Sequence, residues 1–212
     1  MARLHDKPSF AEEEELRRGG FRFIAGVDEA GRGALAGPVT AAAVIIPCST
    51  DHAPWHEEIR DSKLLSPPRR EYLYHHIEEK SLSIGIGMAM PDEIDAYGIV
   101  QATRIAMKMA IELLLPSPDY VLIDYLNIPE ITLPQKGITY GDRLCFSIAC
   151  ASIIAKVTRD RFMCKLEERY PGYKLAKHKG YGTREHMSCL YRMGASPAHR
   201  RSFMPIRGMR EI

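Results

Sequence analysis

The chain has too few cysteines, in too irregular a pattern, to predict a disulfide framework or a zinc site. Its 212 residues include five cysteines, an odd number, and no two of them are spaced as C-x-x-C. We therefore expect free thiols in a reducing, cytoplasmic compartment. The opening residues, MARLHDKPSF, lack the apolar core of a signal peptide and lead to the same expectation.

Long uncharged hydrophobic runs are also missing. The longest stretch without Asp, Glu, Lys or Arg covers residues 33–50, and Gly37, Pro38 and Pro47 interrupt it. Such a segment is typical of a turn followed by a strand rather than of a membrane-spanning helix. We expect no membrane role, since 45% hydrophobic and 26% charged residues is the composition of a globular protein.

Three common functional motifs do not occur. GRGALAG, residues 31–37, has the spacing G-x-G-x-x-x-G and leads into a strand, so it lacks both the spacing and the context of a dinucleotide-binding turn. Neither the P-loop sequence G-x-x-x-x-G-K-[ST] nor the zinc motif H-E-x-x-H is present. Any chemistry must come from other side chains.

Positive charge is concentrated toward the C-terminal end, although the net charge of the chain is only +2. Residues 170–212 carry nine Lys or Arg and two Glu, which gives this segment +7 and leaves −5 for residues 1–169. A basic segment on an acidic body favours a polyanionic partner. The alternative is a solvated segment whose charge only maintains solubility.

Hydrophobic periodicity predicts one α/β domain with a mixed sheet. The expected strands cover residues 21–28, 38–46, 81–89, 119–124 and, more weakly, 136–142. A short helix capped by Ser9 precedes them, and longer helices cover residues 66–80, 91–115 and 147–170. We expect a hairpin at the start of the sheet, a strand added by a helical crossover, and two parts, a core over 1–170 and a basic helical extension over 171–212.

Two helices carry patterns that predict how they pack. Ser147, Ala151 and Ala155 recur at four-residue spacing, so this stripe is small enough to lie close against a sheet. The apolar residues expected on the inner face of the helix over 91–115 are Ile94, Tyr97, Ile105, Met109 and Leu113.

Acidic residues lie where predicted strands end. Asp28 ends the first strand and Glu29 follows it, Asp124 ends the strand over 119–124, and Asp142 ends the strand over 136–142. A carboxylate is costly in the middle of a sheet, whereas at its rim it can coordinate a hydrated cation. The alternative is four unrelated surface acids, which their distant positions in the sequence do not exclude.

The turn after the first strand raises a question of geometry. Asp28 and Glu29 would face opposite sides of a regular strand, so both serve one site only if the chain bends there. Gly31 and Gly33 make a bend sterically easy. Arg32 between them is either an ordinary turn residue or part of a turn whose bare backbone lets a nucleotide approach closely.

Clustered carboxylates repel one another, and divalent cations relieve that repulsion. Ligation by oxygen alone selects hard ions such as Mg²⁺ or Mn²⁺, which also bind phosphate oxygens. Two such ions, roughly 3.5–4 Å apart, can activate a water and stabilise the leaving oxygen of a phosphodiester.

Taken together, these motifs closely resemble those of the bacterial type 2 ribonucleases H, ribonuclease HII. The matching stretches, in the family's order, are AGVDEAGRGALAGPV (25–39), DSK (61–63), YVLID (120–124), GD (141–142), SIACASIIAKVTRDR (147–161), HKGYGT (178–183) and HRRSF (199–203). The resemblance implies a ribonuclease H-like mixed sheet flanked by helices, with a C-terminal helical extension packed on the catalytic core. It also implies a metal-dependent endonuclease that cleaves the RNA strand of RNA–DNA hybrids. Such an enzyme nicks duplex DNA at embedded ribonucleotides and leaves 5′-phosphate and 3′-hydroxyl ends.

The resemblance also implies roles for particular residues. By position, the catalytic and metal-binding carboxylates are Asp28, Glu29, Asp124 and Asp142. The backbone of Gly31, Arg32 and Gly33 helps to recognise the ribose 2′-hydroxyl, and Tyr181 contacts the same sugar. A sensor of this kind must touch the 2′-hydroxyl, because that group distinguishes RNA from DNA. The expected phosphate contacts are Lys63, Ser152 and Lys156, with helix packing as the alternative for the serine.

Three residues depart from the family's usual pattern. Tyr125 stands where a glycine is usual, Leu64 where DSKKL has a second lysine, and Gly182 where KGYPT has a proline. Tyr125 is the most consequential, because a bulky side chain beside a metal ligand can alter access to the site. No carboxylate is lost.

Two alternatives and several partners complete the expectations. Type 3 ribonuclease H shares the fold but lacks the glycine-arginine-glycine element and usually has an N-terminal substrate-binding domain, for which the roughly 20 residues before the first strand are too few. The other alternative is a nucleic-acid-binding module without catalysis. The expected partners are RNA–DNA hybrid, ribonucleotide-containing duplex DNA and a replication or repair protein, and we expect a monomer.

Overall fold

A mixed sheet with the strand order β3-β2-β1-β4-β5 forms the centre of the fold, in a computed structural model that describes residues 7–48 and 54–209. The strands are β1 (Ile24–Ala30), β2 (Val39–Ile45), β3 (Ser83–Ala89), β4 (Tyr120–Asp124) and β5 (Gln135–Ile138). The first three pair antiparallel, and β4 and β5 add in parallel beside β1. The predicted hairpin and crossover strand are confirmed.

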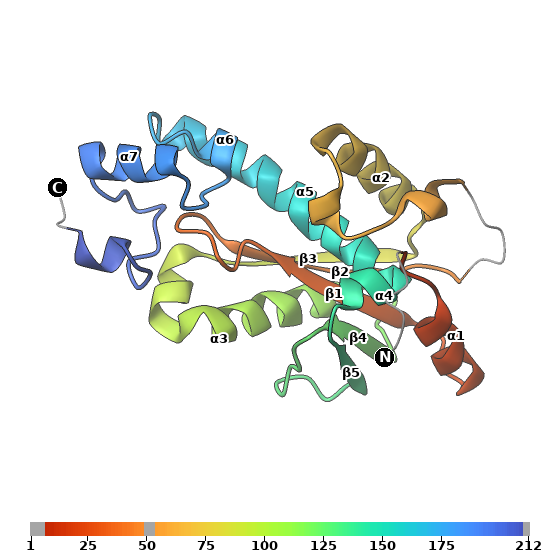
Figure 1. The fold of residues 1–212 in the computed structure, drawn as a ribbon. Helices are drawn as coiled ribbons and strands as arrows, with labels where there is room; N and C mark the ends of the chain where they lie inside the picture. Colours follow the sequence, from red (N-terminus) through yellow and green to blue (C-terminus); the bar gives the residue numbers. More distant parts are fainter. Residues whose placement is uncertain (1–6, 49–53, 210–212) are drawn as a thin grey trace, which may run out of the picture.

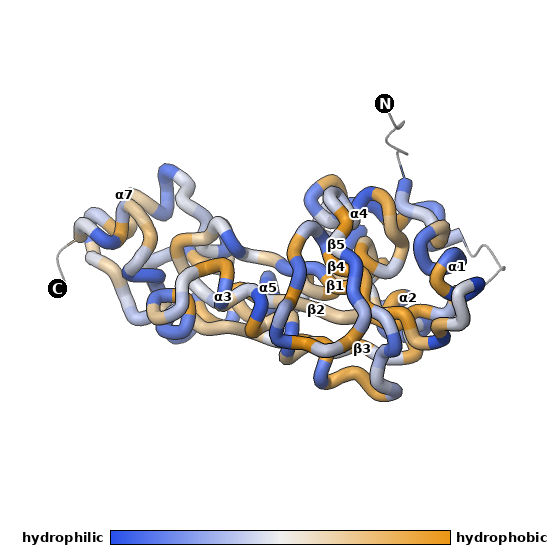
Figure 2. The backbone as a smooth tube through the Cα atoms, turned by 90° about the horizontal axis from the view of Figure 1, so that it is seen from below, coloured by the Kyte–Doolittle hydropathy of each residue, from blue (hydrophilic) through white to orange (hydrophobic). Residues whose placement is uncertain are grey.

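Helices cover both faces of this sheet (Figure 1). On one face lies α3 (Pro91–Glu112), and on the other lie α2 (Pro67–Lys80) and α5 (Phe146–Arg169). Successive side chains of β2 explain the arrangement: Ala41 and Ala43 pack toward α3, whereas Ala42 and Val44 pack toward α5 and α2. Hydrophobic segments accordingly follow the central strands in Figure 2.

The long helix α5 lies unusually close to β1. A Cβ at Gly26 would collide with the backbone of Ser147, and Ala151 and Ala155 are fully buried on the same stripe. The predicted small-residue stripe is therefore confirmed. It places Ser152 and Lys156 of α5 near the end of β1.

The inner face predicted for α3 is partly wrong. Ile94 is buried, but Tyr97, Met109 and Leu113 are 61%, 42% and 62% exposed. The buried face instead consists mainly of Ala102, Ala106, Met107 and Ala110. Gly98 (φ 78°, ψ 159°) interrupts the helix and shifts its phase, and the glycines of β3 admit only small side chains close to the sheet.

Two local predictions also need correction. The helix α1 (Ala11–Arg18) begins after Phe10 rather than after a Ser9 cap, because the Ser9 backbone bonds to Leu144 and Phe146. The strand β5 ends at Ile138, so Asp142 lies not at a strand end but in the short helix α4 (Gly141–Leu144). Short 3₁₀ turns cover Pro54–Glu58, Ser62–Leu64 and Ile206–Gly208.

The basic C-terminal segment packs beyond the end of the sheet, with α6 (Leu175–His178) and α7 (Arg184–Met193) near the C-terminal end of α5 (Figure 1). An apolar cluster joins it to the rest of the fold through Leu35, Ala36 and Met163. Among the described residues, no helix is long and apolar enough to cross a membrane.

Candidate active site

Acidic side chains gather where the parallel pairing of β1 with β4 ends. The parallel pairing of the two strands stops at Val27 and Ile123, so Asp28 and Asp124 directly follow it. Asp142 reaches the same place from α4, and the backbone N–H of Gly141 donates to Asp124 Oδ1 at 2.7 Å. Segments far apart in sequence therefore bring these carboxylates together.

Glu29 joins the cluster without the bend that we expected. The strand β1 stays paired with β2 through Ala30, so the chain is regular at both acidic residues. β4 ends at Asp124, however, and leaves the side of β1 beyond Val27 uncovered. Glu29 consequently lines a cleft of about 380 Å³ together with Asp124 and Asp142, which we call the acidic cleft.

Burial and mutual repulsion disfavour the ionised forms of these carboxyls. Asp28 is only 4% exposed, and burial together with the charges of Glu29 and Asp124 raises its pKa well above the usual value. Burial also raises the pKa of Glu29, Asp124 and Asp142, the last with the charge of Asp61 as the next cause.

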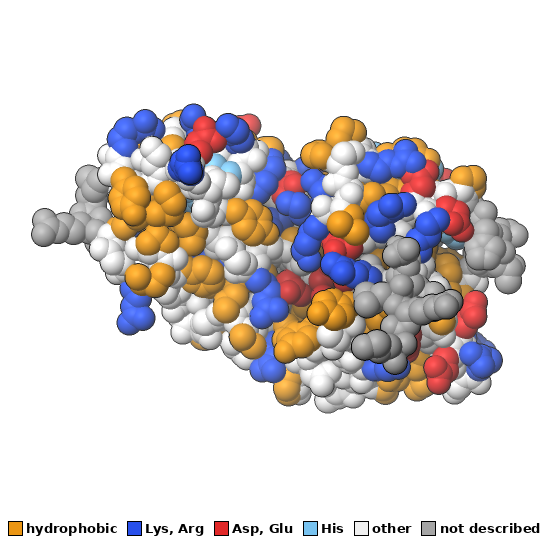
Figure 3. Space-filling model, in the orientation of Figure 1, with side chains coloured by type: hydrophobic (Ala, Val, Ile, Leu, Met, Phe, Trp, Pro, Cys, Tyr) orange, Lys and Arg blue, Asp and Glu red, His pale blue; other side chains and the backbone are white. Residues whose placement is uncertain are grey.

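Cationic side chains surround the cleft but compensate it incompletely. Arg32 Nη1 lies 3.3 Å from Glu29 Oε1, and Lys63 Nζ lies 3.9 Å from Asp142 Oδ2. Although partial burial opposes protonation of Lys63, neighbouring carboxylates raise its pKa. Figure 3 shows acidic side chains near the middle of this face with Lys and Arg around them. Lys63 thus lies where it can contact an anionic substrate.

Asp61 and Arg143 belong to this site and were missed in the sequence. Asp61 is 2% exposed; its Oδ1 accepts the N–H of Lys63 at 2.9 Å and its Oδ2 lies 3.3 Å from Arg143 Nη2. It therefore shapes the loop that carries Lys63. Two signals in the sequence could have indicated them: Asp61 is the first residue of the DSK motif, and Arg143 directly follows the GD motif.

The glycine-arginine-glycine turn lies next to the acids. The N–H of Ala34 donates to Gly31 O at 3.2 Å and closes the turn. Gly31 has φ 92°, and a Cβ there would collide with the Arg159 side chain, so only glycine fits. At Gly33, in contrast, a Cβ would meet no described atom within 4 Å. The protein itself therefore gives no steric reason for that glycine.

Tyr181 lines the same cleft as the turn, which has a volume of about 560 Å³ and which we call the sensor cleft. Its ring is 38% exposed, with Arg159 Cζ 5.5 Å and Lys156 Nζ 6.0 Å from the ring centroid. Its backbone is fixed on both sides, because its N–H donates to His178 O and its carbonyl accepts from His186 Nδ1. The predicted sensor residues are thus neighbours in space.

Ser152 and Lys156 also line the sensor cleft, but their side chains have partners within the protein. Ser152 is 3% exposed; its Oγ lies 2.9 Å from Ser62 Oγ, and its hydrogen bond to Asp28 lowers the pKa of that carboxyl against the larger effect of burial. Lys156 Nζ donates to Asp160 at 2.7 Å, and burial lowers its pKa.

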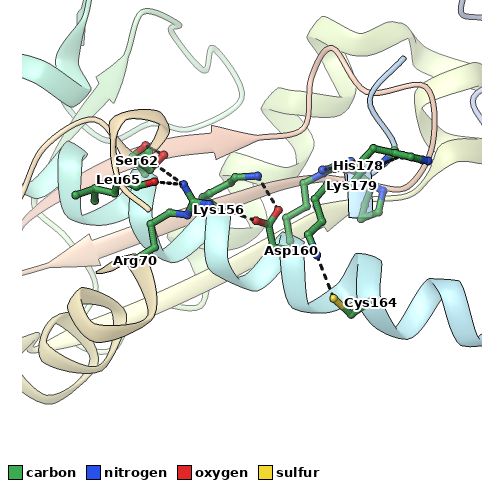
Figure 4. A network of polar contacts seen from close by, with 12 residues as sticks. Ser62, Leu65, Arg70, Lys156, Asp160, Cys164, His178 and Lys179 are labelled. Carbon is green, nitrogen blue, oxygen red and sulfur yellow. Dashed lines mark hydrogen bonds and ion pairs between the residues drawn. The ribbon is translucent and has the colours of Figure 1, made fainter. Parts of the chain in front are cut away.

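Arg70 supports this side of the cleft, as Figure 4 shows. Its Nη1 donates to Ser62 O at 2.9 Å and to Leu65 O at 2.7 Å, which ties the DSK loop to α2. A groove of about 760 Å³ continues past Lys156 and Tyr181 and is lined also by Lys177 and Lys179. A cationic path therefore leads away from the acids.

The acidic cleft has the donor chemistry for a hard divalent ion, because its potential ligands are carboxylate oxygens. Within residues 7–48 and 54–209, however, no three acidic, histidine or cysteine side chains converge as a ready-made metal site. Repulsion between the carboxylates and the contacts of Glu29 and Asp142 with Arg32 and Lys63 account for this spread. The donor set fits such ions, and side-chain rotation has to complete the geometry.

The three residues that depart from the family's usual pattern, Tyr125, Leu64 and Gly182, lie at the surface or in a turn. Tyr125 has φ 61°, is 66% exposed and lines the acidic cleft beside Asp124. This left-handed backbone explains why glycine suits the position. Leu64 is 69% exposed, and Gly182 lies against Leu35, which a Cβ would approach to 3.1 Å.

Known proteins share both the sequence and the fold. The family model described as Ribonuclease HII matches residues 25–206. Ribonuclease HII of Dehalococcoides mccartyi strain BAV1 is 59% identical over 202 residues, which are 95% of each chain. Ribonuclease HII of Desulfitobacterium hafniense strain Y51 is 49% identical over 201 residues, covering 95% of this chain and 76% of the relative.

Two solved structures illustrate the similarity in fold. The ribonuclease H2 from Pyrococcus horikoshii OT3 matches with a TM-score of 0.74 at 24% identity, covering 88% of this chain and 96% of that one. A structure described as Bst-RNase HIII in complex with Mn²⁺ matches with a TM-score of 0.65 at 15% identity, covering 87% and 68%. These likenesses confirm the predicted mixed sheet flanked by helices.

Proposed function

The chain belongs to the ribonuclease HII family, and on that premise we propose that four carboxylates catalyse its reaction, namely those of Asp28, Glu29, Asp124 and Asp142. As a member of the family it is a ribonuclease H-type endonuclease, a metal-dependent hydrolase that acts on the RNA of RNA–DNA hybrids. The observation that carries the assignment is that these four carboxylates converge beside the end of the β1–β4 pairing. Burial and mutual proximity raise their pKa values.

Each carboxylate has a distinct place in this proposal. Asp28 is the most firmly held, because Ser152 and the N–H of Glu29 donate to it. Asp124 is oriented by the N–H of Gly141, whereas Glu29 and Asp142 contact the cationic side chains of Arg32 and Lys63. When bound, two ions of Mg²⁺ or Mn²⁺ would supply activation of the attacking water and stabilisation of the leaving oxygen. The products are a 5′-phosphate and a 3′-hydroxyl.

Substrate recognition is proposed for the sensor cleft. The turn over residues 31–33 lets the sugar approach closely, which is supported by the open space at Gly33. Tyr181 offers an apolar ring face and a hydroxyl to the same ribose. Lys63 and Lys156 hold phosphates, and Ser152 acts mainly by orienting Asp28. This arrangement supports nicking at ribonucleotides embedded in duplex DNA.

The two alternatives fit less well. The match to the ribonuclease HII model over residues 25–206 favours the type 2 class over type 3. A module that only binds nucleic acid would gain nothing from partly buried carboxylates that repel one another, because such a cluster lowers stability without an ion.

One assay tests the whole proposal. A duplex with a single ribonucleotide and the matched all-DNA duplex are incubated with the protein, with Mg²⁺ or Mn²⁺ and with EDTA. We expect a metal-dependent nick on the 5′ side of the ribonucleotide and no cleavage of the DNA. Binding of both duplexes without a nick would refute it.

Tyr181→Ala tests the sensor within the same assay. We expect kcat/KM for the single-ribonucleotide duplex to fall by about tenfold or more, the cost of losing one aromatic contact, while affinity for plain DNA is kept. Tyr191→Ala is the matched control, since Tyr191 is 76% exposed on α7. Equal losses on both duplexes would contradict a sensor role.

A partner and a compartment complete the proposal. A neighbouring structure, 25% identical with a TM-score of 0.70 over 86% of this chain and 95% of that one, is the complex of PCNA with RNase HII from Archaeoglobus fulgidus. It supports a replication partner for this chain too. The cysteines of the described residues are free thiols, which fits a cytoplasmic protein. The division into a core over 1–170 and an extension over 171–212 stays a prediction, as does the monomeric state.

A further inference from the structure

Two arginines that the proposed chemistry does not use lie beneath the glycine-arginine-glycine turn. Arg159 and Arg200 are both 0% exposed, and neither forms an ion pair with a carboxylate in the part of the chain that the structure describes. Burying a guanidinium without a counter-ion is costly unless hydrogen bonds satisfy its N–H groups. Both side chains are satisfied by backbone carbonyls, and the position of those carbonyls is informative.

Arg200 bonds to the turn itself. Its Nη2 donates to Gly31 O at 2.8 Å, its Nη1 to Arg32 O at 2.8 Å, and its Nε to Gly37 O at 3.0 Å. In a trans peptide unit the C=O of one residue and the N–H of the next point in opposite directions. Two carbonyls drawn to the buried guanidinium therefore turn the N–H groups of Arg32 and Gly33 outward.

These two N–H groups are available to a ligand. Neither has an acceptor among the described residues, and both belong to residues that line the sensor cleft of about 560 Å³. A Cβ at Gly33 would meet nothing within 4 Å, so the space beside its α-carbon is open. A sugar hydroxyl, which has acceptor lone pairs and a rotatable O–H, suits such a pair of donors.

Arg159 performs the corresponding task for the other wall of the cleft. Its Nε donates to Pro38 O at 2.9 Å, its Nη2 to Ala36 O at 3.1 Å and its Nη1 to Lys179 O at 2.9 Å. It thereby ties the segment after the turn to the loop that carries Tyr181.

We propose that Arg200 is a positioning residue for ribonucleotide recognition, which fixes the peptide units of residues 31–33 so that two N–H groups face the 2′-hydroxyl. Arg159 holds the Tyr181 loop at the matching distance. The inference rests on the proposed role of this turn as the sensor. Lysine cannot replace Arg200, because one ammonium group does not reach three carbonyls in a planar fork.

The test compares Arg200→Lys with the parent protein on two duplexes, one with a single ribonucleotide and one of DNA alone. Affinities are measured in EDTA, so that no turnover occurs, and kcat/KM is measured with Mg²⁺. We expect the ratio of the two affinities to fall by about tenfold, corresponding to roughly two backbone hydrogen bonds, while plain-DNA affinity stays within twofold. Arg18→Lys is the matched control, because Arg18 is an exposed arginine of α1 that donates to the carbonyl of Glu14.

The outcomes separate this inference from the proposed function. A parent protein that does not prefer the ribonucleotide duplex refutes the sensor itself. A selective parent with an equally selective Arg200→Lys overturns the positioning role, even if its Tm is lower. If the lysine variant does not fold, Arg200→Gln, which keeps an amide donor and removes the repulsion from Arg159, receives the same measurements. The affinity ratio is measured within one preparation, so a loss of folded protein does not change it.

Discussion

The acidic cleft and the buried arginine pair both collect like charges, but they neutralise them in opposite ways. The carboxylates around Asp28 are short of partners, and burial and proximity raise their pKa values. Arg159 and Arg200 are buried more deeply, yet each of their guanidinium nitrogens donates to a backbone carbonyl. Burial lowers the pKa of Arg200 to about 9, which leaves it protonated at neutral pH.

This difference distinguishes side chains that are open to bind an ion from side chains that fix the geometry of their neighbours. A cluster left unsatisfied by its own protein is ready for an external ion, and it costs stability until that ion arrives. A cluster satisfied internally cannot bind anything further, so its contribution is the fixed geometry of its neighbours. Charge alone would not have distinguished the two.

Asp124→Asn is the most damaging change on the acidic side. It replaces an anionic ligand by a neutral near-isostere that can still accept from Gly141, so we expect normal folding and a roughly thousandfold loss of turnover. Cleavage of a single-ribonucleotide duplex with Mg²⁺ measures it. The control is Asp119→Asn, just before β4 and at the opposite end of the strand from Asp124, where the carboxylate accepts from the backbone N–H groups of Arg22 and Phe23. Turnover near the parent rate would exclude Asp124 as a ligand.

A divalent cation alone should stabilise the parent protein. Raised carboxyl pKa values mean that the folded state loses stability as pH rises and these groups ionise, and a bound cation restores it. At a concentration of 100 Kd we expect Mn²⁺ to add about 2.7 kcal/mol, or roughly 5–10 °C in Tm. The increase should be larger at pH 8 than at pH 5 and smaller in Asp124→Asn. Equal shifts in both proteins would contradict the site.

The histidines next to the arginine pair should respond to pH with the opposite sign. His186 Nδ1 donates to Tyr181 O, so its Nε2 accepts from His199 Nε2 at 3.0 Å, and His199 Nδ1 accepts from Ser196. Burial, together with the neighbouring imidazoles, lowers the pKa of His186 and His199 to about 4. Both are therefore neutral when folded, and stability is lost as pH falls from about 6.5 toward 4.

His199→Gln measures that dependence. We expect the parent to lose about 2 kcal/mol more unfolding free energy between pH 7 and pH 4.5 than this variant, since each pKa unit corresponds to about 1.4 kcal/mol. Urea titrations across the range provide the values. His75→Gln, an exposed histidine of α2, should follow the parent. Parallel curves for parent and His199→Gln would show that the pair does not titrate.

Tyr125→Gly should have the smallest effect. Glycine removes the strain of a left-handed tyrosine but makes the unfolded chain more flexible, so we expect a change in unfolding free energy below about 1 kcal/mol. Turnover should stay within a few-fold, because the ring is 66% exposed. A large loss of activity would instead make the tyrosine part of substrate binding.

Local pattern predicted most of the fold, and it noted acidic residues where predicted strands end. The strand over 38–46, the strand over 119–124 and the small stripe of α5 each depend on neighbouring residues, and all three predictions were correct. The inner face of α3 was misread because Gly98 interrupts the helix and shifts its phase, and because the glycines of β3 admit only small side chains of α3 close to the sheet. The bend at Asp28 and Glu29 was unnecessary because β4 stops early, which only the pairing reveals.

The contacts of the positioning side chains could not be predicted from the sequence for a different reason. Arg200 and Gly31 are 169 positions apart, and Arg143 and Asp61 are 82 apart. Nothing in the spacing of HRRSF or DSK indicates which arginine is buried or which carbonyl it meets. The sequence could supply these residues as motif letters but not as contacts.

The long reach of Arg200 also sets an order of assembly. The acids and the turn lie within residues 28–142, whereas Arg200, whose side chain bonds to the turn, is incorporated almost sixty residues after Asp142. A growing chain therefore contains the proposed catalytic carboxylates before it contains the arginine proposed to fix the sensor turn. On the proposal made above, discrimination between sugars is therefore acquired later in synthesis than the capacity for hydrolysis.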